Sequence, residues 1–458
     1  MKEKHRKTFS KKSFICCILI FITLFLPVCS NAEVLTSVNN SDNTSYTPNV
    51  TYQYKQDEQK VLEGVPEIGC KAAYIAEPTT GKVIYEKNAH EKMYPASTTK
   101  ILTALVVLEN CDVNDKAKVS QNAINLVPPD YSNAKLKAGE EVSISDLLKA
   151  LLIPSANEAA NVLAEHVSGS VEDFAVLCNK RAGELGCETL HFVNPNGLHD
   201  ENHYCSAYDL YLVAKECIKH AEFNEIVSMK SFTLPATNAY PRADRTFKNR
   251  NEMLLPGTYY YSYCTGIKTG HTEPAGECLV ASSSYNDMEF ISVVLGGKTR
   301  NKQGLNERFY DTKQLFEFGY NNYSIKKIAN YGETVASIEV GKAVKEEAAL
   351  DLIVDTDIST VVPNDVNKEN VSTSVSINEN IVAPIEQNQV LGQITYSVDG
   401  LVYTTNIIAS HQVKKLPYEQ YNLIVVTVGV AILFIISAKA KSSKKRKNRY
   451  KNKKGTRA

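Results

Sequence analysis

Two apolar runs, each next to a cluster of basic residues, limit what this 458-residue chain can fold into. Residues 2–12 are rich in lysine and arginine, an apolar run extends from Phe14 to Val28, and Ser30-Asn31-Ala32 offers a small-x-small sequence. This pattern is typical of a secretory signal peptide, here covering residues 1–32 and cleaved after Ala32. The alternative is an uncleaved anchor, and both interpretations predict that the chain is exported.

The second run, Leu423 to Ala438, has sixteen residues without a formal charge, and Tyr421 can extend it into the membrane interface. We therefore predict a transmembrane helix over residues 421–438 in contact with membrane lipid. A lysine-rich tail at 439–458 follows and should stay cytoplasmic, which places the chain before the helix outside the cell membrane. A helix lying in the interface is the alternative, but the run is apolar on every face, which favours a single pass.

The formal net charge of zero hides an acidic centre. Residues 1–32 hold six Lys or Arg and one acid, and residues 423–458 hold eleven Lys or Arg and no acid. The residues between them contain 34 basic and 50 acidic side chains, a net charge of −16. Recognition of nucleic-acid phosphates needs a basic surface, so this composition excludes nucleic acid as a partner.

The exported part divides into a linker and two domains. Residues 33–65 are rich in Asn, Ser, Thr and Gln without apolar periodicity, which predicts a flexible linker. Residues 66–322 combine strand patterns with a block of helical patterns, which indicates an α+β domain with an antiparallel sheet. The expected hairpin pairs 73–75 with 83–85, the expected helices are 98–109, 145–153 and 157–167, and the later strands are 266–268, 277–282 and 290–295.

From residue 323 to 415 the helical patterns end and short alternating segments predict a small all-β domain. Asp399-Gly400 between two such segments is a strong hairpin signal. This domain contains no cysteine and one histidine, His411, so it offers no catalytic chemistry. A spacer role is favoured over a partner-binding one.

Ser97 and Lys100 are candidates for a nucleophile and its base. They lie three residues apart at the start of an expected helix, and hence on the same face. A serine hydroxyl needs a base to remove its proton, and lysine can be that base only if burial or a nearby cation lowers its pKa. Ser132-x-x-Lys135, Ser324-x-x-Lys327 and Ser442-x-x-Lys445 share the spacing, in a polar loop, a domain junction and the basic tail, so spacing alone is weak evidence.

Two further elements strengthen the case. Ser155-Ala156-Asn157 lies between two expected helices, where Ser155 can relay protons and Asn157 can bind a substrate amide. Lys268-Thr269-Gly270 lies on a strand, where a cation beside a hydroxyl suits a substrate carboxylate and the glycine lets a ligand backbone approach. We also expect the charge of Lys268 to help keep Lys100 neutral. A second Ser-x-Asn, at Ser41, lies in the linker and is discounted.

These three elements, in this order on an exported chain, resemble the penicillin-binding protein and serine β-lactamase superfamily. Within it, the flanking sequences are most similar to the low-molecular-mass D-alanyl-D-alanine carboxypeptidases, over about residues 66–415. The resemblance implies a β-lactamase/transpeptidase-like catalytic domain, followed by the β-domain and the membrane helix. It implies removal of the terminal D-alanine from peptidoglycan stem peptides during cell-wall biogenesis, with β-lactam antibiotics as covalent inhibitors and no cofactor.

The resemblance also implies roles for individual residues. Ser97 attacks the substrate carbonyl, Lys100 is its general base and Ser155 passes the proton to the leaving D-alanine. The substrate-binding residues are Asn157, Lys268, Thr269, Gly270, His271 and Arg308, with the backbone N–H groups of Ser97 and His271 forming the oxyanion hole. The family uses an arginine downstream of the Lys-Thr-Gly strand for the substrate carboxylate, and the sequence leaves Arg300 and Arg308 as alternatives.

Other functions fit the sequence less well. A β-lactamase requires fast deacylation, for which class A enzymes use a water-activating glutamate, and the sequence shows no convincing equivalent between Asn157 and Lys268. A transpeptidase would share the acylating residues, and a catalytically silent wall-binding protein would not need an intact serine–lysine pair. His199, His203 and Cys205 do not match a zinc spacing, and the two histidines are expected to be solvated loop residues, so no metal is predicted. The eight cysteines beyond residue 32 permit either disulfides or buried free thiols.

Overall fold

The computed structural model describes residues 51–54 and 64–454. The predicted signal peptide and most of the predicted linker lie outside the described residues.

The sheet that supports the site is five-stranded and antiparallel, with the strand order β3-β2-β10-β9-β8. The two outer strands of the order are β3 (Val83–Lys87) and β8 (Cys264–Thr272). The inner ones are β2 (Ala72–Ala76), β9 (Gly276–Tyr285) and β10 (Met288–Gly297). All the strands expected from the sequence between residues 73 and 295 are therefore present.

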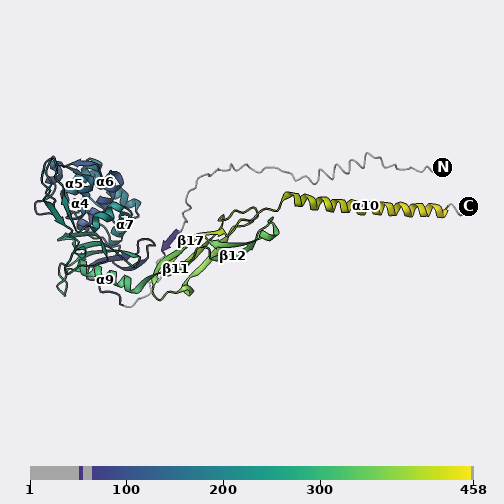
Figure 1. Cartoon of the computed structure of the whole chain (residues 1–458). Helices are drawn as coiled ribbons and strands as arrows, with labels where there is room; N and C mark the ends of the chain where they lie inside the picture. Colours follow the sequence, from purple (N-terminus) through teal and green to yellow (C-terminus); the bar gives the residue numbers. More distant parts are fainter. Residues whose placement is uncertain (1–50, 55–63, 455–458) are drawn as a thin grey trace, which may run out of the picture. The chain divides into compact units, whose positions relative to one another are not determined.

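Side chains alternate between the two faces of this sheet, and each face has its own hydrophobic core. Along β2, Ala73 and Ile75 join the core with helix α9 (Glu307–Asn322). Tyr74 and Ala76 join the core on the other face, with helices α2 (Lys100–Asn110), α4 (Ile144–Leu152), α5 (Asn157–Ser168), α6 (Val171–Glu184) and α7 (Ala207–Cys217). Figure 1 shows α4 to α7 grouped together, with α9 across the sheet from them. The predicted α+β class with an antiparallel sheet is confirmed.

Helix boundaries follow local capping signals. The serines Ser143, Ser170 and Ser206 each accept a hydrogen bond from the first turn of α4, α6 and α7, and Gly169 ends α5 in the left-handed conformation. The helices are α2 (Lys100–Asn110), α3 (Gln121–Asn125), α4 (Ile144–Leu152), α5 (Asn157–Ser168), α6 (Val171–Glu184), α7 (Ala207–Cys217), α8 (Ala221–Ser228) and α9 (Glu307–Asn322). Short turns η1 (Ala96–Thr99) and η2 (Glu252–Leu254) and the small pairs β4 (Lys116–Lys118) with β5 (Glu141–Ser143) and β6 (Ser231–Leu234) with β7 (Arg245–Lys248) complete this part.

After α9 the described chain up to residue 415 consists of strands with two short 3₁₀ turns, η3 (Lys345–Glu347) and η4 (Lys368–Asn370), and has its own hydrophobic core. A sheet with the order β12-β13-β17-β16-β15 is built from β12 (Thr334–Glu339), β13 (Ala349–Val354), β15 (Ser372–Ile377), β16 (Val390–Val398) and β17 (Leu401–Ala409). The strands β11 (Tyr323–Ala329) and β14 (Ile358–Pro363) form a separate pair. The predicted hairpin is present, because Asp399 and Gly400 both take the positive φ that a tight turn between β16 and β17 requires.

One strand lies in the segment predicted to be a flexible linker. Thr51–Tyr54 forms β1, which pairs antiparallel with the first half of β17, within the segment interpreted as linker. Its sequence Thr-Tyr-Gln-Tyr alternates polar and aromatic residues as a strand does, but so short a run inside a polar segment is a weak signal.

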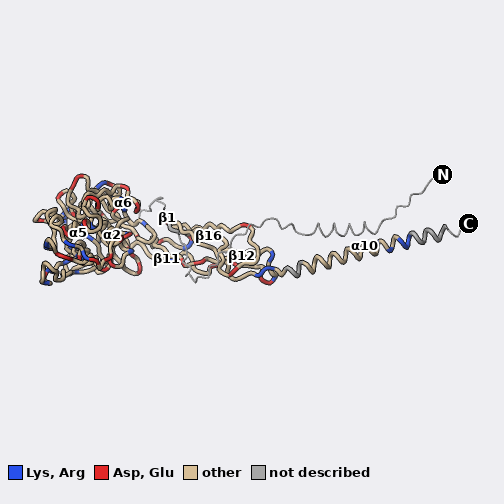
Figure 2. Tube along the Cα trace, turned by 90° about the horizontal axis from the view of Figure 1, so that it is seen from above, with Lys and Arg blue, Asp and Glu red and all other residues tan. Residues whose placement is uncertain are grey.

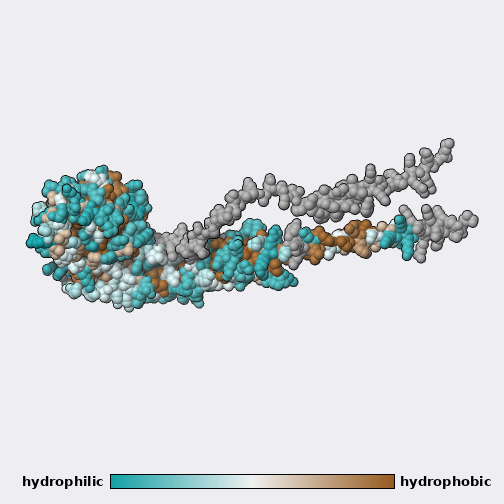
Figure 3. Space-filling model, turned by 45° about the horizontal axis from the view of Figure 1, so that its top comes forward, coloured by the Kyte–Doolittle hydropathy of each residue, from teal (hydrophilic) through white to brown (hydrophobic). Residues whose placement is uncertain are grey.

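The last helix, α10 (Tyr418–Lys454), is longer than the predicted 421–438 because it continues through the basic residues. Residues Asn422–Arg446 are long and apolar enough to cross a membrane, with a mean hydropathy of 2.5 over the most apolar window, and none of that window is buried against the protein. Figure 3 shows the apolar stretch of α10 and Figure 2 the Lys and Arg residues that follow it. This is the composition expected of a membrane anchor.

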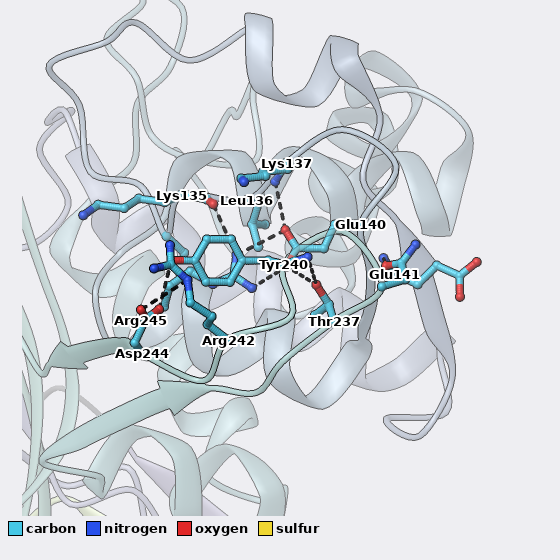
Figure 4. Close-up of polar contacts among 12 residues, drawn as sticks. Lys135, Leu136, Lys137, Glu140, Glu141, Thr237, Tyr240, Arg242, Asp244 and Arg245 are labelled. Atoms are coloured by element: carbon cyan, nitrogen blue, oxygen red, sulfur yellow. Dashed lines mark hydrogen bonds and ion pairs between the residues drawn. The ribbon is translucent and has the colours of Figure 1, made fainter.

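The loop of residues 126–139, which we call the cleft loop, is held by a buried ion pair. Arg245 on β7 and Glu140 at the end of the loop are 2% and 0% exposed, and each Nη atom of Arg245 reaches one carboxylate oxygen (Figure 4). Arg245 also donates to the carbonyl of Lys135 at 3.2 Å, and the ring of Tyr240 lies 4.3 Å from the Arg245 guanidinium carbon. Glu140 Oε2 in turn accepts the backbone N–H of Lys137 at 2.9 Å, so this one pair fixes several points of the loop.

Removing one partner of this pair should be strongly destabilising. In Arg245→Met the Glu140 carboxylate stays buried without its cation, which costs about 3–5 kcal/mol of the free energy of unfolding. Unfolding of the detergent-purified chain by denaturant measures the loss. Glu141→Gln, which changes the exposed neighbouring carboxylate, should stay within about 0.5 kcal/mol of the wild type. Equal stability of Arg245→Met and Glu141→Gln would contradict this assignment.

Candidate active site

The candidate nucleophile lies on a tight turn rather than in a regular helix. Residues Ala96–Thr99 form the 3₁₀ turn η1, and α2 begins only at Lys100. Ala96, directly before Ser97, has a φ of +48°, a left-handed conformation that is uncommon outside glycine. Ser97 is half-buried and its side chain lines a cleft of about 510 Å³.

Lys100 is completely buried, and its amine has three hydrogen-bond partners. Nζ lies 3.1 Å from Ser97 Oγ, 2.7 Å from Asn157 Oδ1 and 2.5 Å from the Asn196 carbonyl oxygen. The two amide oxygens can only accept, so a neutral amine gives them its two N–H groups. Its lone pair then faces the one partner that carries a proton, the Ser97 hydroxyl, as general-base activation requires.

The pKa of Lys100 supports this role. Burial lowers it from 10.5 to about 7, because the ammonium form loses its hydration; Glu158 opposes this shift and Arg250 adds to it. The pKa of Lys268 is also lowered, by burial first and by Lys100 second. Lys100 and Lys268 therefore lie close enough for each ammonium to disfavour the other, and Arg250 is a further cation that lowers the pKa of Lys100.

Ser155 lies in the same cleft in a strained conformation. Ser155 has a φ of +68° and is 2% exposed, and its Oγ has no hydrogen-bond partner among the described residues. A non-glycine residue in the left-handed region costs about 1–3 kcal/mol and persists where the surrounding structure enforces it. A free hydroxyl held in this way is available to a bound substrate.

Asn157 occupies a different position from the one expected. Its Oδ1 accepts from Lys100, while both its Nδ2, at 3.1 Å, and its backbone N–H, at 2.9 Å, donate to the carbonyl of Ser132. The side chain is 3% exposed and is not part of the cleft lining. In this structure Asn157 therefore connects Lys100 to the cleft loop.

The Lys-Thr-Gly strand passes directly beside the nucleophile turn. A Cβ atom added to Gly270 on β8 would lie 2.9 Å from the carbonyl oxygen of Pro95 and 3.1 Å from the Ser97 nitrogen, so only glycine allows this approach. Lys268, 1% exposed, donates from Nζ to the Thr269 carbonyl at 3.0 Å. Thr269 and Gly270 line the cleft.

The structure separates the two candidate arginines. Arg308, at the start of α9, lines the cleft, with Nη1 2.6 Å from Glu277 Oε2 and 3.2 Å from the Gly270 carbonyl oxygen. Arg300 lines a separate cavity. His271 also lines the cleft, and its Nδ1 lies 3.2 Å from Glu277 Oε1.

Some residues of the site gave no sequence signal. Arg250 lines the cleft and donates from Nε to the Pro154 carbonyl at 2.9 Å, which holds it beside the segment carrying Ser155. It lies in a stretch without periodicity or a known motif. The cleft loop, set aside as a polar loop with a chance Ser-x-x-Lys spacing, contributes Tyr131 and Ser132 to the cleft.

The histidines of the 194–205 segment differ from expectation. His199 is exposed as expected, but His203 is 2% exposed, so the prediction that it is solvated is wrong. Among the residues that the structure describes, no group of three or more His, Cys, Asp or Glu side chains is arranged to hold a metal ion.

A serine with a buried, deprotonatable lysine one helical turn away, beside a Lys-Thr-Gly strand, defines the class of serine acyltransferases that penicillins acylate. The family follows from two matches: residues 59–299 match the D-alanyl-D-alanine carboxypeptidase family, and residues 323–415 match the penicillin-binding protein 5 C-terminal domain. The chain belongs to the D-alanyl-D-alanine carboxypeptidase family, as the sequence predicted.

Individual relatives agree with this assignment. D-alanyl-D-alanine carboxypeptidase DacF of Bacillus subtilis is 32% identical over 79% of this chain and 89% of its own length. Penicillin-binding protein 5 from Haemophilus influenzae has a solved structure that matches with a TM-score of 0.61 and 28% identity, over 77% of this chain and 99% of that one. The Streptomyces K15 DD-transpeptidase matches with a TM-score of 0.52 and 28% identity, over 56% of this chain and 98% of that one.

The rate of acylation should follow the ionisation of Lys100. Because only the neutral amine accepts the proton of Ser97, the second-order rate constant for acylation by penicillin should rise about tenfold per pH unit at low pH and level off above about 7. Glu158→Gln removes a charge that raises the pKa of Lys100, so the acid limb should move to lower pH. Stopped-flow labelling with a fluorescent penicillin gives the profile. If the acylation rate instead rose with a pKa near 10.5, the ordinary lysine value, Lys100 would be excluded as the base.

Proposed function

We propose that this protein hydrolyses the peptide bond between the two terminal D-alanines of peptidoglycan stem pentapeptides, through an acyl-enzyme on Ser97. Family membership supports the reaction class. The observation that carries the assignment of the nucleophile is the hydrogen bond of 3.1 Å between Ser97 Oγ and the buried Lys100 amine.

Acylation begins when Lys100 takes the proton of Ser97 and Oγ bonds to the carbonyl carbon of the penultimate D-alanine. The backbone N–H groups of Ser97 and His271 stabilise the resulting oxyanion, a contribution worth about 10²–10³ in turnover for a single donor. The bond from carbon to the leaving nitrogen then breaks. Ser155 gives its proton to that nitrogen and regains one from the Lys100 ammonium, so the terminal D-alanine leaves as a neutral amine.

Deacylation repeats these steps with water in place of the serine. Water adds to the acyl carbon while Lys100 accepts its proton, and the ester bond to Ser97 breaks as the proton returns to Oγ. No metal or cofactor takes part.

A carboxypeptidase recognises its substrate by the carboxylate at the end of the peptide. We assign it to Thr269 and to the guanidinium of Arg308, which line the same cleft as Ser97. Arg308 is preferred to Arg300 because Arg300 faces a different cavity. The pairing of Arg308 with Glu277 fixes the direction of its guanidinium.

Two rival enzymes share the acylation step. A β-lactamase must hydrolyse its acyl-enzyme fast, with a carboxylate that activates water in one class of these enzymes. Glu158, the carboxylate that acts on Lys100, instead accepts the Ala134 N–H at 2.6 Å and does not line the cleft. A transpeptidase would pass the acyl group to an amine, and one solved relative is titled a DD-transpeptidase.

We further infer that the catalytic part is exported by the N-terminal signal peptide and held at the outer face of the cell membrane by α10, as a single-pass protein. The length and apolar composition of Asn422–Arg446 and the basic residues that follow support this topology. The same proposal includes contact of α10 with membrane lipid and a cytoplasmic position for the basic tail.

Labelled penicillin tests the nucleophile. Mass spectrometry of the detergent-purified chain should find one adduct, on the peptide containing Ser97, and Ser97→Ala should abolish it. Ser324→Ala is the matched control, because it removes the serine of another Ser-x-x-Lys spacing on β11 and should leave labelling unchanged. A persisting adduct in Ser97→Ala, or none in the wild type, would contradict the proposal.

Product analysis tests the reaction. A pentapeptide ending in D-Ala-D-Ala should yield free D-alanine and the tetrapeptide, and an added amino-acid acceptor should form little or no transfer product. Dominant transfer would instead identify a transpeptidase, and rapid release of hydrolysed penicillin a β-lactamase.

Fractionation tests the anchor. A chain ending at Leu416 should appear in the soluble extracytoplasmic fraction, whereas the full chain should stay with membranes after a high-salt wash because apolar insertion is insensitive to salt. Release of the full chain by salt would indicate a peripheral helix.

A further inference from the structure

His203 is a buried titratable residue that the proposed reaction does not use. It is 2% exposed and stacks on Phe192 with the ring centroids 4.5 Å apart. Both ring nitrogens have protein partners: Nδ1 lies 3.1 Å from the backbone nitrogen of Val193, and Nε2 lies 2.7 Å from Thr99 Oγ1. Thr99 belongs to the turn that carries Ser97.

These partners define the tautomer. The Val193 N–H can only donate, so Nδ1 must accept and the proton of the neutral ring is on Nε2. Nε2–H therefore donates to Thr99 Oγ1, and the Thr99 hydroxyl donates in turn to the carbonyl oxygen of Ala96 at 2.8 Å. The three groups form one directed chain of hydrogen bonds that ends on Ala96.

Burial keeps these hydrogen bonds in the arrangement that the neutral His203 ring requires. It lowers the pKa of His203 from 6.5 to about 3, so the ring stays neutral at working pH and is not a proton-transfer group.

The chain of hydrogen bonds ends at the peptide group between Ala96 and Ser97. A peptide group is planar, so fixing the direction of the Ala96 C=O also fixes the direction of the Ser97 N–H, on the opposite side. This N–H is among the first of its turn, which have no partner inside the turn, and the Ser97 nitrogen faces β8 at Gly270. It is the donor assigned above to the oxyanion.

The orientation of this peptide needs support, because Ala96 has a φ of +48°. Support comes from two sides. Thr99 binds the Ala96 carbonyl, and Gly197 packs so closely that a Cβ there would lie 1.9 Å from the Ala96 oxygen. Without the hydrogen bond from Thr99, the strained peptide loses the contact that holds its carbonyl away from the cleft.

We propose that His203 is a positioning residue which, through the hydroxyl of Thr99, orients the Ala96–Ser97 peptide so that the Ser97 N–H points at the oxyanion. The inference rests on the proposed function, since it requires Ser97 to be the acylated serine. We expect His203 to help stabilise the tetrahedral transition state, where the oxyanion forms, and not to contribute to substrate binding in the ground state.

The experiment compares isosteric changes in the full detergent-purified chain. Thr99→Val removes the hydroxyl with little change of volume, and His203→Phe keeps the stack on Phe192 but removes both nitrogens. Each should lower kcat for D-alanine release and the penicillin acylation rate by about tenfold, less than the 10²–10³ expected for complete loss of an oxyanion donor. KM should change by less than about threefold, because substrate binding is not involved.

Matched variants identify the cause. Thr99→Ser, which restores the hydroxyl, should recover most of the lost rate. His191→Phe, an exposed histidine in the same segment, should behave as the wild type. The double variant His203→Phe/Thr99→Val should be no slower than the slower single variant, because both break the same chain of bonds.

A peptide boronic acid, which forms a tetrahedral adduct with the serine oxygen, gives an independent readout. Its affinity should fall by the same factor as kcat/KM, while the thermal midpoint of Thr99→Val stays near that of Thr99→Ser. Additive losses, a loss confined to KM, or unchanged boronate affinity would each overturn the inference. If the wild type carries no penicillin adduct on Ser97, the proposed function fails instead, and the two failures are distinguishable.

Discussion

The site depends on the burial of one amine. Lys100 has no contact with solvent, and it can remain there only because Ser97, Asn157 and Asn196 satisfy its hydrogen bonds and burial favours its neutral form. These partners come from three distant parts of the chain: the nucleophile turn, the start of α5 and the turn before α7. The fold as a whole therefore sets the proton affinity of Lys100, the proposed base. Helix α2, buried over most of its length between the sheet and its neighbouring helices, provides the apolar surroundings.

A second constraint is the close approach of backbones around the nucleophile. Gly270 lets β8 reach the Ser97 nitrogen, and Gly197 lets the 194–198 turn reach the Ala96 oxygen. The two glycines thus bracket the same peptide group from opposite sides, and any side chain at either position would displace it. The hydrogen bonds of Thr99 and His203 complete this enclosure, so a strained backbone is held in one conformation before substrate arrives.

Much of this could be predicted from the sequence, for physical reasons. The Ser97–Lys100 spacing, the polar residues at 155–157 and the single Lys-Thr-Gly carry chemistry that few other arrangements use, and hydrophobic periodicity located α2, α4, α5 and the strands β8 to β10. Arg250, Glu158 and His203 were missed or misjudged because their roles depend on which distant groups surround them. His203 lies in a polar stretch that suggests a solvated loop, yet packing on Phe192 buries it. Asn157 was recognised, but its attachment to the Ser132 carbonyl required the path of the cleft loop.

The conformation of Ser155 has a consequence for evolution of this enzyme. Glycine adopts a φ of +68° without strain, so Ser155→Gly would relieve the backbone and make the folded protein more stable, while removing the hydroxyl that we propose protonates the leaving group. Activity and robustness are thus opposed at a single position. The chain keeps a residue that weakens its own native state, and a search for heat-tolerant variants without selection for turnover would be expected to discard it.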